Sequence, residues 1–157
     1  MRLFGIFIFL IIAFAAGFFW RDSIYEVKNT SNDIGYNKDA LLIGKNEILV
    51  EVADTELLQS VGLSGRDYLG ENEGMLFVFD ISEQYAFWMK DMRFPIDIIW
   101  ISEDKKVADI TKNLTPESYP AQYTPIVPVS LVIEVNSGWV DGHDVKIGDM
   151  VTLPDFD

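Results

Sequence analysis

The stretch AFWMKDMRFPIDIIW, residues 86–100, contains the pattern that decides how this chain folds. In its second half, and on to Ser102, alternate positions form two faces that are both apolar apart from one aspartate, Asp97. A strand that is apolar on both faces belongs in the middle of a sheet. Pro95 fits the first position of such a strand, where no ladder donor is needed. We therefore expect a central strand at Pro95–Ser102.

Asp97 would be buried in that strand, where an unpartnered ionised carboxylate costs several kcal/mol. We expect its partners to be a cation, from Lys90, Arg93 or Arg66, or backbone N–H groups at the turn before Pro95. One interpretation is structural, with Asp97 fixing this turn. The other is functional, with a pair of Asp97 and a cation lining a pocket.

Similar patterns along the chain predict further short strands, at Ile48–Val52, Gly74–Asp80, Ala86–Lys90, Val107–Ile110, Leu131–Val135 and Met150–Leu153. The segment ADTELLQSVG differs from these, because Thr55 can cap a short helix that Gly62 can end. The residues between Glu103 and Lys106 are typical of a hairpin turn. Many short strands and one short helix predict a mainly β domain, an antiparallel sandwich or barrel, over residues 45–157.

The first twenty residues have a different character, because Leu3–Trp20 contains no polar side chain. Eighteen helical residues span roughly 27 Å, close to the thickness of a bilayer core. Arg2 and Arg21 flank this segment, and it continues through Trp20, beyond the signal-peptidase-like AFA at Ala13–Ala15. We expect an uncleaved transmembrane anchor at residues 1–20, with a cleaved signal peptide as the alternative. Residues 21–44 are predicted to be a polar linker that holds an extracytoplasmic domain near the membrane.

Composition restricts the chemistry of the domain. Twelve basic residues against 25 acidic ones give a formal net charge of −13, so nucleic acid is not an expected partner. There is no cysteine and only one histidine, His143, so thiolate chemistry and sites with several histidines are excluded. Phosphate-binding loops and dinucleotide fingerprints are absent, and GLSGR lacks the second glycine of a nucleophile elbow. We expect no catalytic residue, metal or cofactor.

The segment Thr111–Ser130 contains four prolines, which exclude a regular central strand or helix. Long irregular loops in compact domains often act as lids or binding loops. We expect this loop to cover one end of the domain and to contribute Tyr119 or Tyr123 to a pocket. The alternative is a proline-stiffened segment that covers a sheet edge.

Three segments in order carry a resemblance to a known family: Gln59–Phe79, Phe87–Ile101 and Leu131–Val151. They contain an E-G-M-L-F block, F-W-M-K with P-[LI]-D five residues after the lysine, and an L-E-x-x-x-G segment with a closing G-D. The chain resembles the family called domain of unknown function 192, DUF192, although that family usually reads G-L-M-F-R where GLSGR stands here. The resemblance implies a β-rich, jelly-roll-like fold, often behind a signal or anchor segment. It implies no catalytic residues.

Ligand binding is the function that the residues themselves favour. In FWMK, alternation places Phe87 and Met89 on one face, and Trp88 and Lys90 on the other. An exposed aromatic beside a cation suits a sugar ring or an anionic group. The alternative is that Trp88 packs on the proline-rich loop and Lys90 pairs with an acid. By the same reasoning the candidate binding residues are Arg66, Trp88, Lys90, Asp97, Tyr119, Tyr123 and Trp139.

These observations favour a membrane-tethered extracytoplasmic binding or interaction module, with a glycan or an envelope protein as candidate partners. An envelope hydrolase acting on a glycan is the alternative enzyme hypothesis, and it requires two carboxylates about 5–9.5 Å apart in a cleft. A structural accessory of an envelope or secretion complex is the third hypothesis, and it requires neither a cleft nor such a pair.

Overall fold

The computed structural model describes residues 36–153 of the 157-residue chain. The predicted anchor at residues 1–20 lies outside the described residues, as does the predicted linker up to residue 35. From residue 36 to residue 153, no helix has the length and apolar character needed to cross a membrane.

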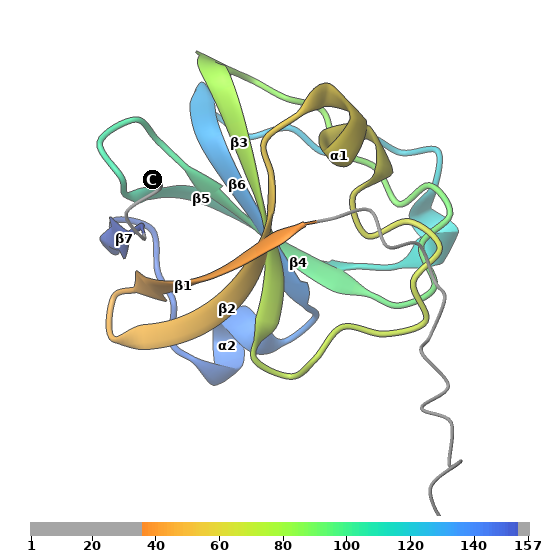
Figure 1. The fold of residues 1–157 in the computed structure, drawn as a ribbon, viewed down its shortest axis with the longest axis horizontal. Coiled ribbons are helices and arrows are strands. Elements are labelled where there is room, and N and C mark those ends of the chain that lie inside the picture. The colour runs from red at the N-terminus through yellow and green to blue at the C-terminus, as the bar shows by residue number, and fades with distance from the viewer. Residues whose placement is uncertain (1–35, 154–157) are drawn as a thin grey trace, which may run out of the picture. The chain divides into compact units, whose positions relative to one another are not determined.

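The described part of the chain is mainly β, with short helical segments (Figure 1). Its elements, in order, are β1 (Asn37–Ile43), β2 (Asn46–Ala53), α1 (Glu56–Val61), β3 (Glu73–Glu83), β4 (Ile96–Ile101), β5 (Val107–Leu114), the 3-10 helix η1 (Pro116–Ser118), β6 (Val129–Asn136), α2 (Trp139–Gly142) and β7 (Val151–Thr152).

The strands form one curled, seven-stranded sheet with the order β5-β4-β6-β3-β2-β1-β7. A bridge between Lys106 and Met150 brings the two edges of the sheet together at one end, so that the sheet forms a half-barrel. All neighbouring strands are antiparallel except β2 and β3, which are parallel. The mainly β prediction is confirmed. Of the predicted antiparallel sandwich or barrel, the structure shows a single curled sheet that forms a half-barrel, and one strand pair departs from the antiparallel pattern because the connection through α1 returns the chain parallel to β2.

The central strand predicted from PIDIIWIS is confirmed as β4, which pairs with β5 on one side and β6 on the other. All six of its residues are buried. Both faces of the sheet are therefore covered at β4, and each face has its own hydrophobic cluster. One cluster contains Ile99, Ile133 and Trp139 and the other contains Ile98, Met75 and Trp100.

The short helix is confirmed with both predicted ends. The Thr55 side chain accepts a hydrogen bond from the Leu58 N–H, and Gly62 follows the helix with a φ of 52°. The hairpin turn before β5 is confirmed as well, because Ser102 N–H donates to the Lys106 carbonyl. Helix α2 and the 3-10 helix have no counterpart in the sequence-based prediction.

Two predicted boundaries are wrong. The domain begins before residue 45, because β1 at Asn37–Ile43 pairs along its whole length with β2. Ala86–Lys90 is not a strand, since only an isolated bridge from Phe87 to Tyr123 pairs this segment. Its backbone turns at Asp91, which has a φ of 57°. The partner segment around Tyr123 contains the prolines that prevent a longer ladder.

Candidate functional site

A pocket of about 280 Å³ lies between α1 and the end of the sheet nearest to it. Its lining residues come from α1 and the turn that follows, from β3, from the segment after β3, and from one position of β6: Gln59, Ser60, Val61, Gly62, Leu63, Ser64, Phe77, Phe79, Tyr85, Ala86, Phe87, Trp88, Met92 and Glu134. We call this cavity the α1 pocket. Figure 1 shows α1 beside the ends of β3 and β6, far from α2.

Side-chain hydrogen bonds hold α1 above the sheet. The Gln59 amide donates to the Val78 carbonyl over 2.7 Å, and the Tyr36 hydroxyl lies 3.4 Å from the carbonyls of Leu58 and Gly62. Gly62 ends the helix with a φ of 52°, a backbone conformation that favours glycine, and a Cβ atom there would be in ordinary contact with the Phe77 ring at 3.4 Å. These contacts fix the position of one wall of the pocket.

The opposite wall is aromatic. Phe79 and Tyr85 stack with centroids 3.7 Å apart, and Phe87 makes edge contacts with Phe77 at 4.9 Å and with Trp100 at 5.3 Å. Aromatic pairs of this kind are individually favourable and restrict ring motion. The wall is therefore built from rings that support each other.

Glu134 is the one carboxyl group among the described lining residues. Its side chain is 5 % exposed, and it lies on the same sheet face as its cross-strand neighbours Met75 and Ile98, which are buried. Burial raises the pKa of Glu134 to about 8, and the nearby charge of Arg66 only partly opposes this shift. Within residues 36–153, Glu134 Oε2 has no hydrogen-bond partner. The neutral acid therefore predominates at pH 7.

Gly74 positions this carboxyl group. A Cβ at Gly74 would lie 2.9 Å from the backbone oxygen of Glu134, closer than real side chains approach. The glycine of the E-G-M-L-F block is thus required for β3 to lie against β6 at Glu134. This contact gives a physical reason for one residue of the motif.

Arg66 lies next to the pocket, in a polar cluster with Glu51, Lys38 and Tyr36. Its guanidinium is 2.5 Å from Glu51 Oε2, and it lies over the Tyr36 ring at 5.2 Å. Burial alone would raise the pKa of Glu51, but the Arg66 hydrogen bond and charge, with Lys38, outweigh it and lower that pKa. Arg66 is therefore already paired with an acid other than Glu134.

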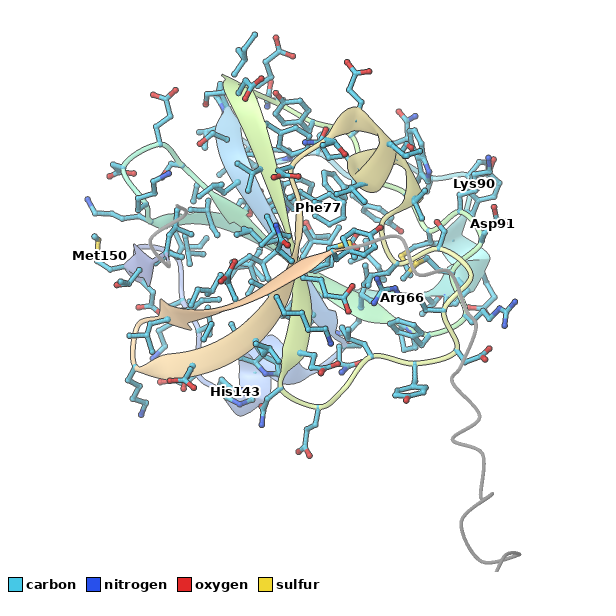
Figure 2. All side chains as sticks on the ribbon, viewed as in Figure 1. Arg66, Phe77, Lys90, Asp91, His143 and Met150 are labelled. Carbon is cyan, nitrogen blue, oxygen red and sulfur yellow. The ribbon has the colours of Figure 1, made fainter. Side chains whose placement is uncertain are left out.

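The structure supports the predicted alternation in FWMK. Met89 is buried and Phe87 is half-buried, whereas Trp88 and Lys90 are exposed. Trp88 lines the α1 pocket, but Lys90 does not. Figure 2 shows Lys90 and Asp91 at the periphery of the domain, away from Phe77. Of the predicted pair of aromatic and cation, Trp88 therefore belongs to the described lining of this pocket and Lys90 does not.

The proline-rich loop does not close the α1 pocket. Neither Tyr119 nor Tyr123 is a lining residue; Tyr119 is 49 % exposed, and Tyr123 is half-buried beside Phe87. The expectation that Thr111–Ser130 is wholly irregular is also wrong, because β5 extends to Leu114 and β6 begins at Val129. The loop pairs with Phe87 through the backbone of Tyr123, and neither predicted tyrosine belongs to the described lining of this pocket.

Two other candidate residues have structural positions. Asp97 is fully buried, and it accepts hydrogen bonds from the backbone N–H groups of Asn113 and Gly138 at 2.9 Å and Val140 at 3.4 Å. Of the two predicted kinds of partner, backbone N–H groups are observed and a cation is not, and these amides come from the end of β5 and the start of α2, not from the turn before Pro95. Trp139 is 4 % exposed in the core, so the proposal that it is an exposed binding aromatic is corrected.

Sequence reasoning missed Glu134 as a site residue. In LVIEV the alternation places Leu131, Ile133 and Val135 on the buried face, which makes Glu134 look solvent-facing. The available signal was the L-E-x-x-x-G segment, whose glutamate is this residue. Within residues 36–153, no cluster of three or more His, Asp or Glu side chains is arranged to hold a metal ion.

Comparison with known proteins shows the family of this chain. The model of the family DUF192, described as uncharacterised ACR, matches residues 40–153. No curated protein matches the chain. A crystal structure from Sinorhizobium meliloti 1021, described as a candidate transcription regulator, is similar with a TM-score of 0.73 and 29 % identity, covering 78 % of this chain and 98 % of that one. A protein of unknown function from Novosphingobium aromaticivorans DSM 12444 is similar with a TM-score of 0.70 and 29 % identity, covering 74 % and 86 %.

Proposed function

Since this chain belongs to the DUF192 family, for which no activity is described, we propose its function from its own site: it is a membrane-tethered extracytoplasmic module that binds a small ligand in the α1 pocket. The observation that carries the binding proposal is Glu134, a buried carboxyl group that lines a preformed aromatic pocket and whose Oε2 has no hydrogen-bond partner among residues 36–153. Buried polar groups are normally satisfied, and exceptions concentrate at functional sites.

The shape and composition of the pocket support a small ligand. A volume of about 280 Å³ is at the lower end of the range for small-molecule sites, and the walls are mainly apolar with few polar groups. Two of the binding residues predicted from the sequence fit this proposal. Trp88 lines the pocket, and Arg66 lies beside it. Lys90, Tyr119 and Tyr123 lie outside this pocket.

A glycan hydrolase is less well supported at this position. Hydrolysis by a carboxylate pair needs two acids facing one cleft, whereas the described residues of the α1 pocket include Glu134 as a single acid. Transcriptional regulation, the description of one similar structure, is not proposed either, because a net charge of −13 opposes contact with a phosphate backbone.

The binding proposal is tested with a fragment library and the full chain in detergent micelles, by saturation-transfer NMR. Ser60→Trp places an indole at the lining of the pocket, and Leu57→Trp places it on the same helix at a residue that is 66 % exposed and outside the lining. We expect fragment signals that Ser60→Trp abolishes and Leu57→Trp retains. Fragments that bind equally to both variants, or no binding fragment at all, would overturn the proposal.

The tether rests on the apolar segment Leu3–Trp20. With the amino terminus inside and the domain outside, protease added to intact cells should remove the domain. Protection from protease would contradict the orientation. Recovery of a soluble product starting at Ala16 would contradict the anchor.

A further inference from the structure

The ligand of the α1 pocket has to satisfy Glu134, and this requirement limits its chemistry. A ligand can accept a hydrogen bond from the neutral acid, or it can bring a positive charge to the carboxylate. An anionic ligand could accept the proton of the neutral acid, but among the described lining residues there is no lysine or arginine to balance its charge. The choice between a neutral ligand and a cation depends on the other groups in the pocket.

Three other polar side chains of the lining already donate hydrogen bonds to backbone carbonyls. The Gln59 amide donates to Val78, the Ser60 hydroxyl donates to the Leu57 carbonyl over 2.8 Å, and the Ser64 hydroxyl donates to the Lys90 carbonyl over 3.0 Å. A sugar needs several free hydrogen-bonding partners, and these side chains do not offer them. Among the buried side-chain nitrogen and oxygen atoms of the described residues, Glu134 Oε2 alone lacks a hydrogen-bond partner, so it is the buried group available for recognition.

The remaining lining favours a cation. Five aromatic side chains and the Met92 thioether surround the pocket: Phe77, Phe79, Tyr85, Phe87 and Trp88. Aromatic faces attract cations by about 0.5–2 kcal/mol each, most strongly in tryptophan, and cages of this type recognise substituted ammonium groups. The net charge of −13 also raises the local concentration of cations.

We propose that the α1 pocket binds a small organic ammonium group, with Glu134 as the counter-charge and the aromatic side chains around Trp88 as its apolar cage. This inference rests on the proposed binding function and names the class of its ligand. The ammonium group belongs either to a free solute or to the headgroup of a lipid, and the two sources share the same recognition chemistry.

Binding of a permanent cation requires Glu134 to ionise, so affinity has to depend on pH. Burial raises the pKa of Glu134 to about 8, and the ionisable groups that act on it are Arg66, from the turn after α1, and Tyr36, before β1. Arg66 is paired with Glu51, and the cross-strand neighbours Met75 and Ile98 are apolar. Affinity for the cation should therefore rise about tenfold per pH unit up to pH 8 and level off above it.

The experiment compares choline with 3,3-dimethylbutan-1-ol, a neutral molecule of the same shape, by isothermal titration calorimetry on the full chain in maltoside micelles. We expect choline to bind at least tenfold more tightly at pH 8, with an affinity that falls toward pH 6. The alcohol should show no such pH dependence. Equal binding of the two probes, tighter binding of the alcohol, or no binding of choline would overturn the ammonium assignment.

Two variants locate the site. Glu134→Gln should lower choline affinity at pH 8 at least tenfold and leave the alcohol unchanged, and Trp88→Ala should weaken choline several-fold. Lys90→Ala is the matched control, since Lys90 is next to Met89 in the chain but outside the pocket lining, and it should have no effect. Retained choline affinity in Glu134→Gln overturns the proposed counter-charge, and thermal unfolding of each variant verifies that it is folded.

Failure of the ammonium assignment can be distinguished from failure of the proposed binding function. If fragments bind and Ser60→Trp blocks them but choline does not bind, the pocket remains a binding site and only the ligand class is wrong. Choline titrations in maltoside micelles doped with phosphatidylcholine, against micelles doped with phosphatidylglycerol, distinguish the two sources, because the proposed anchor inserts into both. Loss of choline affinity in phosphatidylcholine micelles alone indicates the lipid headgroup, and unchanged choline affinity in both indicates a solute; each result supports the ammonium site.

Discussion

Asp97 on β4 and Glu134 on β6 are carboxyl groups buried on neighbouring strands, yet their surroundings are opposite. Asp97 pairs in register with Val135, and Glu134 pairs with Ile98, so the two side chains point to opposite faces of the sheet. Asp97 accepts three backbone N–H groups near α2, whereas Glu134 Oε2 has no partner in residues 36–153 and lies beside α1.

This difference separates a structural acid from a candidate binding acid. The amides around Asp97 come from the end of β5 and from the start of α2, so one carboxylate fixes two chain connections. The Asp97 carboxylate also binds the N–H groups of two residues with a positive φ, Asn113 at 59° and Gly138 at 85°. Nothing comparable surrounds Glu134, where burial without partners makes the acid neutral and leaves it available to a ligand.

The largest expected effect concerns the structural acid. Asp97→Asn removes the charge and presents an amide N–H₂ to backbone donors, so it should lower the free energy of unfolding by about 2–4 kcal/mol. Urea denaturation measures this change. Asp104→Asn, at an exposed residue of the hairpin before β5, is the control and should change stability by less than about 0.5 kcal/mol. An Asp97→Asn variant as stable as the control would remove the distinction between the two acids.

The second effect is a pH dependence at Glu134. Its pKa is about 8 in the folded protein, above the ordinary glutamate value of 4.5. Between pH 4.5 and pH 8 the folded state therefore holds a proton that the unfolded state has lost. The contribution of this group to stability is complete below pH 4.5 and decreases as pH rises toward 8. The free energy of unfolding of Glu134→Gln, taken relative to that of the unsubstituted protein, should rise by about 2–3 kcal/mol as the pH goes from 5 to 7.

Parallel urea titrations at pH 5, 6 and 7 measure this gain. Any constant difference that arises from packing of the glutamine amide cancels in the comparison between pH values. If the difference in unfolding free energy between the variant and the unsubstituted protein does not change with pH, Glu134 is ionised in the folded protein. The contrast with Asp97 would then be lost.

The smallest effect tests the pair beside the pocket. Arg66→Gln removes a half-buried partner of Glu51 and should lower stability by about 1–2 kcal/mol. It should also raise the pKa of Glu134 further, because the charge of Arg66 lowers that pKa. The matched control is Arg93→Gln, whose pair with Asp67 is exposed and should contribute less than about 0.5 kcal/mol. The Glu134 carboxyl is followed by NMR; an unshifted titration in Arg66→Gln would contradict the coupling.

Much of the fold could be predicted from local patterns. The two apolar faces of PIDIIWIS predicted a central strand, and β4 is buried throughout. Thr55 and Gly62 defined the ends of α1 because capping depends on a few adjacent residues. The motifs of three segments identified the family, which the match over residues 40–153 confirms. The parallel pairing of β2 with β3 was not predicted, because strand direction depends on how α1 returns the chain.

The candidate site was accessible to sequence reasoning only in part. The alternation of FWMK correctly placed Trp88 outward, and the sequence specified that Asp97 would be buried and would need donors. The identity of those donors was decided by the tertiary structure, since Asn113, Gly138 and Val140 are 16 to 43 residues away along the chain. At Glu134, the sequence determined the face of β6 on which the carboxyl lies. Only the tertiary structure covered that face with α1 and aromatic side chains, because alternation fixes the direction of a side chain and not what packs against it.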